Sequence, residues 1–169
     1  MDTTNAVRDL LTDSFTRVTE LTAGFRGLDA GTATARPGPD ANSIAWLLWH
    51  TARVQDDHIS GLTGAEQVWA DGWYERFGLP FPYEDFGFGH TSDQVGAVTT
   101  PVDDLVAYQA EVHNATLAYI SQLTLDELER VVDSRWDPPV TASVRLVSVN
   151  GDCLQHLGQA AYVRGLLAR

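Results

Sequence analysis

The chain has 169 residues, enough to bury the core of one domain without a disulfide or a structural metal, and we expect a single domain over residues 1–169. Its net charge is −12 and its eleven basic residues are all arginine, which argues against nucleic acid and anionic membranes as partners. A single cysteine, an N-terminal segment without the pattern of a secretion signal, and the lack of a long apolar stretch predict a cytoplasmic protein without a transmembrane helix.

Apolar residues spaced three and four apart predict a first amphipathic helix over residues 3–28, and a glycine- and proline-rich turn follows it. The apolar stripe of this helix consists of Val7, Leu10, Leu11, Phe15, Val18, Leu21, Phe25 and Leu28. A second helix is expected to begin at Asn42 or Ser43, either of which can cap it, and to end near Gly61. Its apolar stripe consists of Ile44, Leu47, Leu48, Thr51, Val54, Ile59 and Leu62.

Residues 63–100 show no sustained periodicity but contain eight of the sixteen aromatic residues. These are Trp69, Trp73, Tyr74, Phe77, Phe81, Tyr83, Phe86 and Phe88. Long loops in compact domains are uncommon and tend to be functional, so we interpret this segment as a packed lid or pocket wall. The alternative is that it covers one end of a bundle or forms a dimer surface.

A third helix is predicted after Thr100 and Pro101, which resemble a hydroxyl cap and a first-turn proline, and Thr124 has the spacing of a cap for a further short helical turn. The stretch PVTASVRLVSV could form a strand that ends in an Asn-Gly turn, or the first part of a last helix. Helical patterns dominate the chain. They predict an all-α four-helix bundle with a long aromatic-rich loop between the second and third helices.

Two histidines lie on the second predicted helix. His58 falls near the centre of the apolar stripe, and His50 lies about a quarter turn from the centre, at its edge. The pattern therefore predicts that His58 is the more buried of the two and that His50 faces a cavity between helices. For each one, a partly buried, hydrogen-bonded histidine is the alternative to a metal ligand. His90 and His113 have weaker cases.

Asp152 and His156 are four residues apart, so on a continuous helix they share one face and can reach a common ion. The rival interpretation is that Asp152 caps a helix that begins after Asn150-Gly151, with Gln155 completing a capping box. The local pattern slightly favours the cap. Cys153 projects to another face of the helix and is expected to be a buried, inert thiol.

A meeting of His50 with this pair would supply two nitrogens and one carboxylate oxygen to a divalent ion. Such a donor set leaves an open coordination position, as catalytic zinc sites have and structural zinc sites lack.

The segments NSIAWLLWHTARVQDDHI around His50 and GDCLQHLGQAAYVRG around His156 resemble the DinB-like superfamily of four-helix-bundle proteins. The resemblance covers nearly the whole chain, which looks most like the actinobacterial branch that includes mycothiol-dependent maleylpyruvate isomerase and mycothiol transferases. Members typically bind a divalent metal through a histidine of the second helix and two ligands four residues apart on the last helix, before a Gly-Gln pair. The resemblance therefore implies that His50, Asp152 and His156 are metal ligands, with Gly158 and Gln159 as the Gly-Gln pair.

The resemblance places Asp152 inside the last helix and so favours helix for residues 142–149. Asp152 stands where the isomerase has a glutamate and is one methylene shorter. The carboxylate would therefore reach the ion either directly or through a water molecule.

The resemblance also implies a metal-dependent reaction in which a low-molecular-weight thiol is transferred to a small electrophile or promotes its isomerisation. Zinc is the first expectation for the ion, with nickel or another divalent metal as alternatives, and mycothiol is the expected cosubstrate. A bound metal lowers the pKa of a thiol, so that the nucleophilic thiolate forms near neutral pH.

Trp46, Arg53 and Trp73 are candidate substrate-binding residues. Arg53 lies one helical turn beyond His50 and could bind an anionic group, although a surface ion pair with Asp56 or Asp57 is an equal alternative. The competing hypothesis for the whole protein is a non-catalytic bundle, homodimeric in one version, that binds a small apolar ligand and keeps a vestigial metal site.

Overall fold

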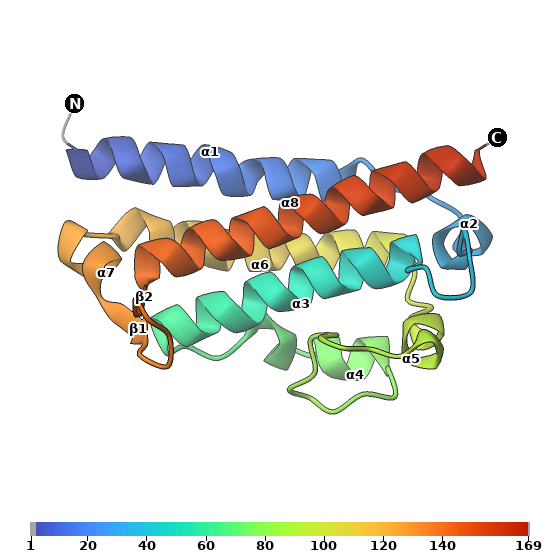
Figure 1. Cartoon of the computed structure of the whole chain (residues 1–169). Helices are drawn as coiled ribbons and strands as arrows, with labels where there is room; N and C mark the ends of the chain where they lie inside the picture. Colours follow the sequence, from blue (N-terminus) through green and yellow to red (C-terminus); the bar gives the residue numbers. More distant parts are fainter. Residues whose placement is uncertain (1–2, 169) are drawn as a thin grey trace.

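The computed structural model describes residues 3–168, which form a bundle of four long helices (Figure 1). The long helices are α1 (Thr3–Ala23), α3 (Ile44–Thr63), α6 (Val102–Gln122) and α8 (Ala142–Leu167). The shorter helical segments are α2 (Ala30–Thr34), η1 (Val68–Ala70), α4 (Trp73–Phe77), α5 (Ser92–Ala97) and α7 (Leu125–Glu129). A small antiparallel hairpin of β1 (Val131–Asp133) and β2 (Val140–Thr141) precedes α8. The predicted all-α four-helix bundle is confirmed.

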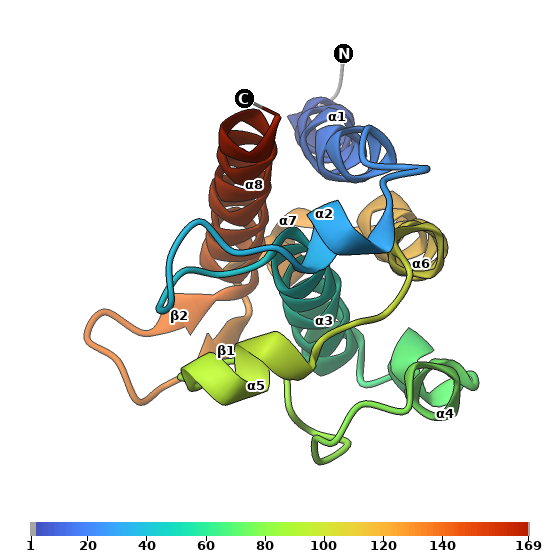
Figure 2. The same cartoon turned by 90° about the vertical axis from the view of Figure 1, so that its right-hand side faces the viewer.

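The direction of the helices explains the long loop. Figure 1 shows α1 and α8 running one way along the bundle and α3 and α6 running the other way. Because α3 and α6 are parallel, their connection must return along the length of the bundle, and residues 64–101 make this crossover. Seen nearly end-on in Figure 2, α3 lies beside α8, with α4 and α5 of the crossover on its outer side.

The second long helix begins and ends at local signals. The Ser43 hydroxyl accepts the Trp46 amide as N-cap, and Gly64, at φ 73°, ends α3 in the left-handed conformation. The predicted start of this helix at residue 42 or 43 is thereby confirmed. The bundle covers one face of α3 and the crossover covers another, so that 15 of its 20 residues are buried.

Burial of the two histidines on α3 is the reverse of what its periodicity predicts. His50 is 7% exposed, whereas the side chain of His58 is 28% exposed. The apolar stripe describes only the face toward the bundle core. The crossover buries His50 from the other side, and a helical pattern holds no information about that cover.

Two further details of the first half differ from the predictions. Helix α1 ends at Ala23, before residue 28, and its stripe members Leu10 and Leu21 are 71% and 51% exposed. The predicted cap of the third helix is also wrong, because Pro101 occupies the N-cap position of α6 and provides no side-chain bond. The predicted cap of the short helix α7 by Thr124 is confirmed, since its hydroxyl accepts the Glu127 amide.

The ambiguous stretch before Asp152 is helical. Strand β2 contains only Val140 and Thr141, and the Thr141 hydroxyl caps α8 by accepting the Val144 amide. From there a buried stripe runs along α8 at Ala142, Leu146, Val149, Cys153, Leu157 and Ala160. Packing of this stripe on α3 and α1 outweighs the β-propensity of the valines. None of the helices within residues 3–168 combines the length and apolar character that a bilayer-spanning segment needs.

Candidate metal centre

Three potential ligands meet where α3 packs against α8. His50 projects from α3, and Asp152 and His156 project from successive turns of α8; one ligand atom from each lies within 4.8 Å of the others. The His50 and His156 rings meet edge to face with centroids 4.6 Å apart, and His156 Nε2 lies 3.5 Å from Asp152 Oδ1. Two imidazole nitrogens and a carboxylate are the donors of a divalent site with an open position.

The alternative role for Asp152 as a helix cap is wrong. Helix α8 begins ten residues earlier, at Ala142. The side-chain amide of Gln155 donates to the Gly151 carbonyl 3.2 Å away and so does not complete a capping box with Asp152. Asp152 Oδ2 is buried and, among residues 3–168, has no hydrogen-bond partner. A buried carboxylate oxygen without a partner is costly unless a cation or water satisfies it, so the arrangement fits a divalent metal ion.

Both histidines of the triad are oriented by an oxygen on the far side of the ring. His50 Nδ1 donates a hydrogen bond to the Phe86 carbonyl oxygen, and His156 Nδ1 donates to Gln159 Oε1 at 3.2 Å. An imidazole that donates through Nδ1 keeps a free lone pair on Nε2 when neutral. Metal-ligating histidines are commonly held in this way, so both rings are prepared to bind an ion through Nε2.

The environment sets the charge of the three groups. Burial lowers the pKa of His50, which keeps its imidazole neutral at pH 7. Contact with His156 lowers the pKa of Asp152, and the same contact raises the pKa of His156. The triad therefore contains an ionised carboxylate and a neutral imidazole, the forms that bind metal.

A chain of hydrogen bonds behind His50 includes His90 and Asp85, whose importance was not predicted from the sequence. The Trp46 indole stacks on His50 at a centroid distance of 4.7 Å, and its Nε1 donates to His90 Nδ1 at 3.0 Å. His90 Nε2 donates to the Asp85 carboxylate at 3.0 Å. The glycine-rich FGFGHTS context of His90 was the available signal.

Gly87 allows the crossover to approach the triad. A Cβ atom at this position would lie 2.9 Å from His50 Nδ1 and 2.9 Å from the Trp49 ring, and the backbone has φ 96°. The Asp85 carboxylate accepts the Gly87 amide at 2.7 Å, which shapes the turn that presents the Phe86 carbonyl to His50. Only glycine fits this turn without displacement.

Arg53 is fully buried and belongs to the anchor of the crossover. Its guanidinium donates to Gln67, to the Tyr108 hydroxyl and to the carbonyls of Tyr83 and Asp85. The predicted contact with substrate would require these bonds to break, so we reassign Arg53 to positioning the loop. Its predicted ion pair with Asp56 is present, with Nη1 3.6 Å from Oδ2, although it is buried instead of exposed.

Trp46 is the only one of the three candidate substrate-binding residues that stacks on the triad within residues 3–168. Trp73 packs against Phe77 and Tyr108, and its Nε1 donates to Glu111 Oε2 at 2.7 Å, so it too stabilises the crossover. Cys153 is fully buried with its thiol directed at the Thr51 carbonyl, and burial raises its pKa. This agrees with the expected inert thiol.

A cavity of about 160 Å³ adjoins the triad. It is lined by His50, Val54, His58, Phe86, Phe88, Ser148, Val149 and Asp152. Phe88 is 87% exposed and lies at the rim of the site, whereas Phe86 is partly buried. The arrangement can therefore hold an ion with one position open to a small molecule between aromatic side chains.

A family model described as mycothiol-S-transferase matches residues 7–169. The chain belongs to the mycothiol-S-transferase family. This confirms the resemblance inferred from the segments around His50 and His156. Membership in this family implies a thiol substrate.

The mycothiol-S-transferase fold of this chain is similar to that of a conserved protein from Enterococcus faecalis, known from a crystal structure. The two chains are 34% identical, with a TM-score of 0.87, and the match covers 97% of this chain and 96% of the other. A comparison with curated proteins gives no match.

Proposed function

We propose that this protein is a metal-dependent enzyme that transfers mycothiol to a small electrophile, or uses it to isomerise one. The observation that carries this proposal is the meeting of His50, Asp152 and His156 with a buried carboxylate oxygen that lacks a partner among residues 3–168. Zinc is the ion we propose first, since two imidazoles and one carboxylate suit it, and nickel is the alternative.

The chain contributes orientation and charge to this chemistry. When bound, a divalent ion supplies a Lewis-acidic position that lowers the pKa of the thiol. The Phe86 carbonyl and the Gln159 side chain engage Nδ1 of the two imidazoles and so leave each Nε2 free to hold an ion. Asp152 contributes negative charge, and the stacked Trp46 ring limits rotation of His50.

The electrophile would bind on the side that the crossover covers. Phe86 and Phe88 line the cavity beside the triad and would exclude water from the reacting sulfur. Cys153 is unnecessary for this reaction because its thiol is buried and its pKa is raised. The nucleophile is therefore the cosubstrate's own sulfur.

Metal retention tests the proposal. Metal-stripped protein would be loaded with Zn²⁺ or Ni²⁺, desalted and assayed by elemental analysis. We expect about one ion per chain in the wild type, as a single triad requires, and strong loss in His50→Ala, Asp152→Asn and His156→Ala. His113→Gln is the matched control, because His113 lies on α6 outside the triad.

An activity assay distinguishes the proposed enzyme from the alternative, a non-catalytic bundle. Loaded protein should accelerate conjugation of mycothiol to at least one class among alkyl halides, epoxides and activated alkenes. Wild-type protein that retains no metal would contradict the metal site. Retained metal with no acceleration for any class would favour the non-catalytic bundle that binds an apolar ligand.

A further inference from the structure

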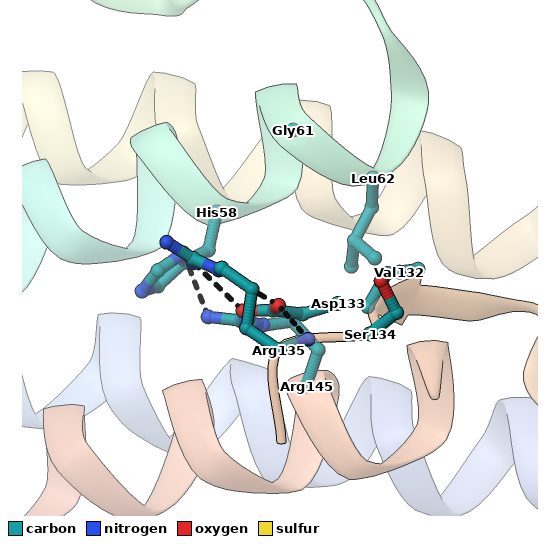
Figure 3. Close-up of a pocket in the computed structure, with 8 residues that line it drawn as sticks. All are labelled: His58, Gly61, Leu62, Val132, Asp133, Ser134, Arg135 and Arg145. Carbon is teal, nitrogen blue, oxygen red and sulfur yellow. Dashed lines mark hydrogen bonds and ion pairs between the residues drawn. The ribbon is translucent and has the colours of Figure 1, made fainter. Parts of the chain in front are cut away.

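A second and larger cavity lies next to the one at the triad. Its volume is about 480 Å³, and it lies between the C-terminal part of α3, the hairpin and the first turns of α8 (Figure 3). The lining residues are His58, Gly61, Leu62, Val132, Asp133, Ser134, Arg135 and Arg145. His58 also lines the cavity at the triad, so the two spaces share one wall.

The register of the two helices places these cavities in line. On α8, Arg145 precedes Asp152 by seven residues, which at 1.5 Å per residue is about 10 Å along the axis. On α3, His58 follows His50 by eight residues, about 12 Å. Ser148 lies between Arg145 and Asp152 and lines the first cavity. A molecule held at the triad can therefore extend along α3 and α8 into the second cavity.

Charged groups of both signs alternate in the second cavity. Figure 3 shows Arg135, Asp133 and Arg145 converging from the hairpin and α8 below His58. Asp133 accepts three bonds from Arg135: two from the guanidinium, at 2.8 and 2.9 Å, and one from the backbone amide, at 3.0 Å. Asp57, which is not part of the lining, has its Oδ2 3.7 Å from Nδ1 of the lining residue His58. The lining thus offers hydrogen-bond donors on two guanidinium groups and acceptors on one carboxylate.

Arg145 is the least committed of these groups. Its Nη1 lies 3.5 Å from His58 Nδ1 and its Nη2 lies 3.6 Å from Asp133 Oδ2, at or beyond the limit of a hydrogen bond. Its side chain is 24% exposed, so the guanidinium faces both the cavity and its two neighbours. A guanidinium has five N–H donors, and long contacts leave most of them available to a ligand.

We propose that this second cavity binds the polyhydroxyl part of the thiol cosubstrate while its sulfur lies at the triad; the inference rests on the proposed function. Mycothiol has a cysteinyl sulfur at one end and a glucosaminyl-inositol group at the other. Each hydroxyl both donates and accepts, which suits a site that presents guanidinium donors beside a carboxylate acceptor better than an anion would. Arg145 donates to this group and Asp133 accepts from it.

Binding of the sulfur-free glycoside tests the inference without any reaction. Glucosaminyl-inositol would be titrated into full-length protein by calorimetry, with and without Zn²⁺. We expect saturable binding that does not require the metal and becomes at least about tenfold weaker in Arg145→Met and Asp133→Asn. Arg17→Met, which removes an exposed arginine paired with Asp13 on α1, should bind as the wild type does. Absent binding, or equal binding by wild type and Arg145→Met, would overturn the inference.

A kinetic comparison provides the second readout. N-acetylcysteine has the same thiol but lacks the polyhydroxyl group, so Arg145→Met should reduce kcat/KM for mycothiol at least about tenfold and leave N-acetylcysteine unchanged. If the variant instead impairs only carboxylated electrophiles, the cavity serves the electrophile and the inference fails. Failure of the proposed function would abolish turnover but leave glycoside binding measurable, so the two failures are distinguishable.

Discussion

The imidazole rings of His50 and His156 meet edge to face with their centroids 4.6 Å apart, although they belong to different helices. The far nitrogen of each ring is bound by a different part of the chain: the backbone of Phe86 in the crossover for His50, and the Gln159 side chain on α8 for His156. The geometry of the candidate metal centre therefore depends on the crossover as much as on the two helices.

Gln159 should support metal binding without supporting the fold. It is exposed and orients His156, so Gln159→Ala should weaken Zn²⁺ affinity about 10–100-fold, as loss of such an outer contact typically does. Competition with a chromophoric chelator measures this change. Gln155→Ala is the matched control, since Gln155 is an exposed glutamine one turn earlier that bonds only to the Gly151 carbonyl among residues 3–168. Equal effects of both variants would contradict the role of Gln159.

Gly87 should be intolerant of a side chain for two reasons, and Gly89 for one. Both have positive φ, at 96° and 74°, but only the Gly87 Cβ would collide with His50 and Trp49; around Gly89 there is nothing within 4 Å. Gly89→Ala should cost about 1 kcal/mol of unfolding free energy from backbone strain. Gly87→Ala should lower the unfolding free energy by roughly a further 1–3 kcal/mol, because the added methyl group overpacks the site, and should also weaken metal binding. Urea unfolding and a metal titration measure the two effects.

Asp56 anchors the crossover and should be important for stability. Its carboxylate accepts the amides of Val68 and Trp69 and the Tyr108 hydroxyl, at 2.9, 2.8 and 2.6 Å. In Asp56→Asn one acceptor oxygen is lost and the buried Arg53 loses its counter-ion, so the free energy of unfolding should fall by about 3–5 kcal/mol.

The control for this variant is Asp57→Asn, at the next residue. Asp57 is about one-third exposed and accepts from Gln67, so its loss should change the unfolding free energy by less than about 1 kcal/mol. Chemical denaturation of both variants, followed by circular dichroism, makes the comparison. Similar stability of the two would contradict the anchoring role of Asp56.

Glu127 should make a small contribution to stability that disappears in acid. Its carboxylate accepts two bonds from Arg130, at 2.7 and 2.8 Å, and one from Tyr119, and these bonds hold its pKa below the ordinary value. For an acid with a lowered folded-state pKa, the stabilisation is present above the unfolded pKa and is lost as pH falls through the folded pKa.

Glu127→Gln should therefore lower the free energy of unfolding by about 0.5–1 kcal/mol at pH 7, and the difference from wild type should vanish once the carboxylate is protonated. Urea unfolding from pH 7 down to pH 3 measures this dependence. Glu129→Gln, an exposed neighbour in α7, should show no such trend. A pH-independent difference for Glu127→Gln would contradict the charge-based explanation.

Much of the fold could be predicted because its signals are local. Ser43 and Thr124 cap the helices that they were predicted to cap, and the apolar stripe of α3 is buried as expected. Prediction from local signals fails where two different parts of the fold cover the same helix, as the bundle and the crossover cover α3. The pattern on α3 placed His58 at the centre of the buried face, but the crossover encloses His50 and Arg53 from the opposite side.

In the candidate metal centre, too, local spacing predicted part of the arrangement and tertiary contacts decided the rest. The spacing of Asp152 and His156 allowed a shared helical face, the local pattern slightly favoured a cap, and only continuity of α8 through residue 152 decided between them. His90 and Gly87 carried weak signals because their importance arises from contacts with Trp46 and His50, distant in the chain.

The sequence by itself determined where the long helices lie, which apolar faces they bury and, through its resemblance, which three side chains to examine. Caps and periodicity act over a few residues, so one chain segment contains all the information they need. The tertiary structure alone decided that His50 meets Asp152 and His156, that Arg53 is enclosed, and that a second polar cavity shares the lining residue His58 with the cavity at the triad. These relationships depend on how α3, α8 and the crossover pack together, and packing between distant segments leaves no periodic trace in either one.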